Sequence, residues 1–160
     1  MGALAAIFVQ PVLALVWTAL PALLNGEMVR GSDLVTLTGL VTLVAAVAVL
    51  AMGVPAFHLL LRVRPFSSRW VGALGFALAA LPIALLAWPA QVRSGYSASR
   101  SWYGLDVTTV VNGVTTVHGW LIYLEGVLVF GVHGWIGALA FGWVWSKCRT
   151  TAQAPVVSAR

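Results

Sequence analysis

Four long runs of apolar residues occupy most of the 160-residue chain, at 3–24, 34–61, 70–90 and 119–146. A helix needs about 20 apolar residues to cross a hydrocarbon layer of about 30 Å, and each run is long enough. Because hydrocarbon offers the backbone no water to bond with, spans of this kind are helices rather than open strands. The pattern predicts an all-α integral membrane protein, with one four-transmembrane-helix bundle over residues 1–147.

The composition agrees with this prediction. Hydrophobic residues make up 61% of the sequence and charged residues 8%, against roughly a quarter charged in soluble domains. The net charge of +5 comes from basic residues that sit singly at segment ends, with no basic run or basic helical face, so we expect no binding to nucleic acid. The expected surrounding is a lipid bilayer.

Arginine and lysine indicate the orientation of the spans. Six of these residues lie in the 62–69 link and from residue 147 onward, against three on the opposite side, where three acids accompany them. The side richer in basic residues usually faces the cytoplasm. We therefore expect a bacterial inner-membrane protein with both termini cytoplasmic and residues 148–160 as a cytoplasmic tail. The first run is longer than the apolar core of a cleavable signal peptide, so we expect it to persist as the first helix.

The connection at 91–118 is the only long one, and its second half predicts a β-hairpin. Two runs rich in Val and Thr flank Asn112-Gly113, a dipeptide suited to the positive φ angles of a type I′ turn. The alternative is a fourth helix that begins early, near Thr108. The first half, 93–105, is rich in aromatic residues and arginine. We expect it to be an interfacial segment or a surface that contacts a partner.

Glu125 is the only acid within the four apolar runs. It lies about 9 Å inside the outer end of the fourth span, at 1.5 Å per residue. An acid at that depth usually faces protein or water and often has a function. Several alternatives stay open: the side chain reaches the interface, stays protonated, pairs with Arg93 or Arg100, or carries protons or a transported ion.

His118 and His133 are the other candidate functional residues. Each lies in a Val-His-Gly-Trp sequence. At about 100° per residue, His118 shares a helical face with Glu125, whereas His133 is rotated by about 80°.

No cofactor or catalytic site is expected. The histidines lie at different depths, and no three ligands converge, so neither haem nor another metal site is expected. No nucleophile with a base and no phosphate-binding loop is present in the sequence, so an enzyme is not expected. Cys148 is the single cysteine, which excludes an intrachain disulfide.

Small residues at four-residue spacing form a ridge on the fourth helix: Gly134, Ala138 and Gly142. Such residues let helix backbones approach closely in lipid. The ridge predicts that the fourth helix is the packing centre, or that it forms a homo-oligomer interface. Proline lies within each of the other three runs and predicts a break in each helix: Pro11, Pro55 and Pro82.

These features favour a non-enzymatic accessory or scaffold subunit that contacts another membrane protein. The alternative is a small oligomeric transporter or proton/ion conduit that is built around the fourth helix and uses Glu125, with His133 as a further lining residue.

The predicted orientation is testable with topology reporters. Fusions at Ser67 and after Arg160 should report a cytoplasmic position, and a fusion at Ser97 a periplasmic one. Exchanged signals at Ser67 and Ser97 would reverse the orientation, and equal signals would refute the four-span topology.

Overall fold

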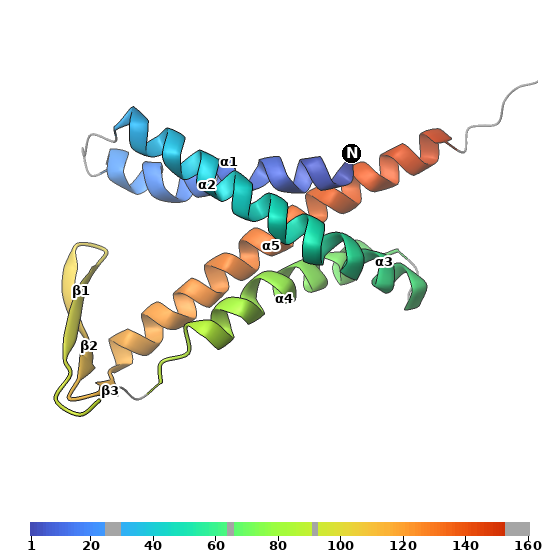
Figure 1. The fold of residues 1–160 in the computed structure, drawn as a ribbon. Helices are drawn as coiled ribbons and strands as arrows, with labels where there is room; N and C mark the ends of the chain where they lie inside the picture. Colours follow the sequence, from blue (N-terminus) through green and yellow to red (C-terminus); the bar gives the residue numbers. More distant parts are fainter. Residues whose placement is uncertain (25–29, 64–65, 91–92, 153–160) are drawn as a thin grey trace, which may run out of the picture.

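The computed structural model describes residues 1–24, 30–63, 66–90 and 93–152. Figure 1 shows long helices and a small sheet. The helical elements are α1 (Gly2–Leu24), α2 (Gly31–Ala48), the π-helical turn η1 (Val49–Gly53), α3 (Val54–Val63), α4 (Ser68–Leu86) and α5 (Val117–Ala152). The strands are β1 (Ala98–Trp102), β2 (Leu105–Val111) and β3 (Val114–Thr115).

Four helices are long and apolar enough to cross a membrane: α1, the continuous α2–η1–α3 segment, α4 and α5. Only 6 to 17% of the residues in their apolar windows are buried inside the protein. In water, so much exposed apolar surface would favour aggregation or association. In lipid the same surface is solvated, which fits a chain that spans a membrane.

Several helix boundaries differ from the sequence prediction by a few residues, and the third and fourth spans differ most. The third span ends at Leu86 rather than at residue 90. The fourth helix begins at Val117 and runs for 36 residues to Ala152, so it includes the first residues of the expected tail. At 1.5 Å per residue α5 is about 54 Å long, which exceeds the roughly 30 Å of a hydrocarbon layer.

The helices form two pairs, α1 with α2 and α4 with α5, and α5 also packs against α1. Figure 1 shows that the pairs diverge at the left, where α1 ends and α5 begins. The sheet lies at this end, which we call the sheet end. The pairs meet at the right, near Met1 and the start of α4, which we call the terminal end. The expected bundle is therefore open at its sheet end, because α2 makes its main contacts with α1 alone.

Glycine brings α4 and α5 into backbone contact. A Cβ atom added to Gly134 would overlap the carbonyl oxygen of Gly75 and the side chain of Ala79. One added to Gly75 would overlap Ala138. We call this line of contact between α4 and α5 the seam. Gly142 lies further along it, where an added Cβ would be 3.4 Å from the ring of Phe66. Gly134 and Ala138 thus face α4 at the point of closest approach.

The prolines affect the helices unequally. Pro55 follows η1, where the wider π-helical turn accommodates the missing N–H and lets α2 and α3 continue as one span. The breaks predicted at Pro11 and Pro82 are wrong, because α1 and α4 continue through them. A proline removes a single N–H donor, and the neighbouring turns keep their own hydrogen bonds.

The terminal end has an aromatic core around Phe57, which is 3% exposed. Its ring centroid lies 4.6 Å from that of Phe141 and 5.3 Å from that of Trp145, both on α5. Phe66, just before α4, contacts Phe57 and Trp145. Offset and edge-to-face ring pairs add stability beyond the area they bury, so this cluster joins α3 and the start of α4 to α5.

The seam predicts a difference between two glycines of α5. Gly134→Ala should lower the free energy of unfolding by about 1–3 kcal/mol, since the added methyl group overpacks the contact with α4. Gly126→Ala is the matched control, because nothing lies within 4 Å of its Cβ position, and it should be neutral or slightly stabilising. Thermal unfolding of both variants in detergent measures the difference. Equal melting temperatures would contradict the close contact.

Candidate functional site

The sheet is built from two successive hairpins with strand order β1-β2-β3. In the second hairpin Val111 pairs with Val114. Asn112 and Gly113 form its turn with φ angles of 50° and 82°, as a type I′ turn requires. The predicted hairpin is confirmed, and the alternative helix start near Thr108 is wrong, because α5 begins at Val117.

The first hairpin has its turn at Tyr103-Gly104. Trp102 pairs with Leu105, and the two turn residues have φ angles of 49° and 80°, again type I′. The expectation of an interfacial segment missed strand β1. Residues other than Gly, Asn, Asp and His are uncommon at positive φ, so Tyr103 gave no indication of a turn. The only signal for this hairpin in the sequence was Gly104 between two short runs of alternating residues.

The tip of the first hairpin binds Glu125 of α5. The Trp102 indole Nε1–H donates a hydrogen bond to Glu125 Oε2 at 2.6 Å. The Tyr103 hydroxyl donates a second one to Glu125 Oε1. Among the described residues, the partners of Glu125 are thus two uncharged donors. The pairing with Arg93 or Arg100, one of the alternatives left open by the sequence, is not observed among these residues. The acid joins the sheet to the longest helix.

The contact with Glu125 changes the pKa of Tyr103. The pKa of Tyr103 is raised above its ordinary value, mainly because its hydroxyl donates to the Glu125 carboxylate, and further through desolvation and the repulsion between two negative charges. The hydroxyl therefore keeps its proton, and with it the hydrogen bond, at alkaline pH values at which a free tyrosine would lose it.

A groove of about 650 Å³ lies beside this contact at the sheet end. One wall is the outward-facing part of α1 with Val16 and Trp17, and the other is α5 from Ile122 to Val129. The hairpin tip closes the groove on a third side and contributes Arg100, Ser101, Trp102 and Tyr103. Its volume is within the roughly 300–1,000 Å³ of common ligand pockets. The two helix pairs diverge at this end, which opens the space between α1 and α5.

The two candidate histidines differ in their relation to Glu125. The ring of His118 lies 6.2 Å, centroid to centroid, from that of Trp102, so the indole contacts both His118 and the acid. His133 lies farther along α5, where its Nδ1 donates to the carbonyl of Val129 at 2.8 Å. His118 therefore belongs to the site around Glu125, whereas His133 does not line this groove.

Gln10 has a role that the sequence did not indicate. Its Nε2 donates to the carbonyl of His133 at 3.0 Å and so links α1 to α5. Gly137 is buried beneath this amide, and a Cβ atom there would lie 2.5 Å from Nε2. A side-chain hydrogen bond between helices is a common means of joining them in lipid.

The groove combines aromatic side chains with a few charged groups. Among the residues that the structure describes, no three His, Cys, Asp or Glu side chains converge as metal ligands. Cys148 is exposed on α5 beyond the aromatic core. The groove instead combines indole and phenol surfaces with one guanidinium and one carboxylate. Groups of these kinds can make stacking contacts, hydrogen bonds and ion pairs with a ligand.

Comparison with protein-family models, with curated proteins and with solved structures finds no match to this chain. The function is therefore inferred from the geometry of the groove and of the Glu125 contact.

The Glu125–Tyr103 contact predicts how the protein titrates in alkali. The chain has three tyrosines, so the difference in tyrosinate absorption between the wild type and Tyr103→Phe isolates Tyr103. Its pKa should exceed 10.0 in the wild type and fall toward that value in Glu125→Gln. The stability from this contact should be complete below the ordinary tyrosine pKa and lost as the pH rises through the raised one.

Asp106→Asn is the control for this titration, because it removes one negative charge from β2 without touching the contact. An equal fall in the Tyr103 pKa in both variants would mean that net charge, rather than the hydrogen bond, causes the shift.

Proposed function

We propose that the protein is a non-enzymatic accessory subunit of the bacterial inner membrane, and that the groove at its sheet end binds one transmembrane helix of a partner protein. Both termini and the 62–69 link face the cytoplasm, and the sheet lies on the periplasmic side. The single observation that carries the proposal is the hydrogen bonding of Glu125 to the hairpin tip. This contact fixes the hairpin as one wall of a groove between α1 and α5.

The state of Glu125 favours a structural role over proton transfer. Both carboxylate oxygens accept hydrogen bonds from side chains of the hairpin. A proton carrier must exchange protons with water and with a second group along a path. The nearest ring neighbours are Trp102 and Tyr103, and Trp102 can only donate. The indole therefore offers no acceptor for a proton, and its hydrogen bond joins β1 to α5.

The walls of the groove favour a protein partner. Trp17 is 53% exposed and Val16 55% exposed on α1, and Tyr103 is 73% exposed at the hairpin tip. Exposed Trp, Tyr and Arg side chains are the residues that dominate binding energy at protein interfaces. A helix enters such a site with its apolar side toward α1 and α5, while polar groups at its end meet Arg100 and Ser101. Gly126 leaves room on the α5 side, since no atom lies near its Cβ position.

The proposal predicts site-specific crosslinking in cells. A photoreactive residue at position 17 or 103 should capture the same membrane protein, and one at position 35, equally exposed on α2, should not. Gly126→Trp should abolish capture at both positions by filling the groove, without lowering thermal stability. Val44→Trp, an enlargement of an exposed residue on α2, is the matched control and should keep capture unchanged. Equal capture at positions 17 and 35 would refute a specific groove.

The alternative function, a proton or ion conduit, can be tested with variants of Glu125. Glu125→Gln keeps the size of the side chain and an oxygen acceptor, so folding and partner capture should persist. Glu125→Leu leaves two donors unpaired and should cost about 1–3 kcal/mol of stability. Liposomes with a pH-sensitive dye should show no proton flux that depends on Glu125. A flux in the wild type that disappears in Glu125→Gln would establish the conduit instead.

A further inference from the structure

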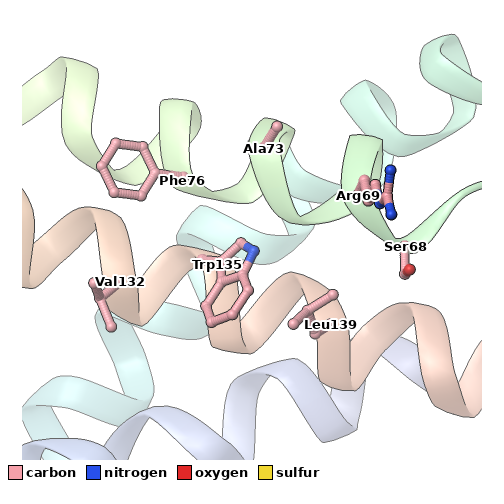
Figure 2. Close-up of a pocket in the computed structure, with 7 residues that line it drawn as sticks. All are labelled: Ser68, Arg69, Ala73, Phe76, Val132, Trp135 and Leu139. Carbon is pink, nitrogen blue, oxygen red and sulfur yellow. The ribbon is translucent and has the colours of Figure 1, made fainter.

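A second groove, of about 680 Å³, lies at the terminal end between α4 and α5. Figure 2 shows the rings of Phe76 and Trp135 in the seam between the two helices. Both rings depend on glycine: a Cβ atom at Gly72 would overlap the indole, and one at Gly131 would overlap the phenyl ring. The close-packed seam thus produces a groove whose walls are largely apolar.

One basic side chain lies at the mouth of this groove. Arg69, in the first turn of α4, lines it together with Ser68, and Figure 2 shows both at one end of the groove, away from Phe76. The acids that the structure describes, Asp33, Asp106 and Glu125, belong to elements of the sheet end. Within the described ranges, the Arg69 guanidinium therefore has no carboxylate partner.

The lining residues change in character with depth. Arg69 is at the start of α4. Trp135 is level with Gly72, which is about 6 Å from Ser68, the first residue of the helix. Phe76 is about 12 Å from Ser68, at 1.5 Å per residue. The order from the mouth inward is a cation, an indole N–H and then hydrocarbon surface.

A phospholipid has the complementary order of groups: a phosphate, ester carbonyls and an acyl chain. Guanidinium binds phosphate oxygens through paired charge-assisted hydrogen bonds. Tryptophan favours the ester level of a membrane, where its ring is in hydrocarbon and its N–H finds an acceptor. A headgroup with a net negative charge matches the mouth better than a zwitterionic one, whose own ammonium offsets the attraction to Arg69.

We propose that this groove binds one anionic phospholipid of the adjacent leaflet, with the phosphate at Arg69 and an acyl chain along Ala73, Phe76 and Val132. The site is independent of the proposed partner groove, because it lies between α4 and α5 rather than between α1 and α5 and uses none of its residues. It gives the protein a preference among lipids in addition to its binding of a protein partner.

Lipid binding to the full chain in mild detergent tests the proposal, with native mass spectrometry counting bound molecules. The probes are phosphatidylglycerol and phosphatidylcholine with identical acyl chains. The wild type should retain one phosphatidylglycerol more tightly than phosphatidylcholine. Arg69→Gln should weaken phosphatidylglycerol binding about fivefold, the effect of one basic residue at an anionic surface. Arg62→Gln, an equal charge change on α3 at the same end, should leave it unchanged.

A second variant tests the apolar part of the site. Ala73 is exposed on α4, so Ala73→Trp fills the groove without disturbing packing, and it should lower binding of both lipids. Leu81→Trp, exposed on the same helix outside the groove, is its control. The proposal is overturned if the wild type binds both lipids equally, if Arg62→Gln weakens binding as much as Arg69→Gln, or if Ala73→Trp binds phosphatidylglycerol as tightly as the wild type.

Discussion

The close contact between α4 and α5 at Gly75 and Gly134 is the constraint on which the remaining structure depends. Two backbones approach here because neither glycine has a Cβ atom. In lipid, helices gain nothing from leaving water, so dispersion contacts at short distance must hold them together. The seam fixes α4 on one side of α5 and leaves another side for α1, where the Gln10 amide binds the carbonyl of His133. The central position of α5 follows from these two contacts.

The divergence of the helix pairs makes the hairpin contact necessary. At the sheet end α1 and α5 lie apart, and an acid on α5 would face this open space without partners. The tip of the first hairpin supplies two donors to Glu125, and the hydrogen bonds in turn position the tip beside the groove. A short, two-stranded hairpin is only marginally stable alone. The pairing of β3 with β2 and the hydrogen bonds to Glu125 therefore stabilise the β1–β2 hairpin, which forms one wall of the groove.

The two grooves have opposite chemistry and lie along successive stretches of α5. The groove at the sheet end contains a carboxylate whose oxygens are already hydrogen-bonded, with aromatic side chains around it. The groove at the terminal end contains a guanidinium without a described carboxylate partner above hydrocarbon walls. The first is the proposed site for a partner's helix, and the second is the proposed site for an anionic lipid. The two grooves share no lining residue, so the two proposed sites are independent of each other.

The sequence by itself determined the elements that depend on local chemistry. Apolar runs of membrane-crossing length predicted the four helices, and Asn112-Gly113 predicted the second hairpin, because both signals come from neighbouring residues. Tertiary structure alone decided the rest. It placed Tyr103 at positive φ in a turn whose sequence matches no common type I′ pair. It also brought Trp102 to an acid 23 residues away and left the bundle open at one end. These outcomes depend on which helix faces meet, and a strongly apolar sequence leaves that choice to small differences in close packing.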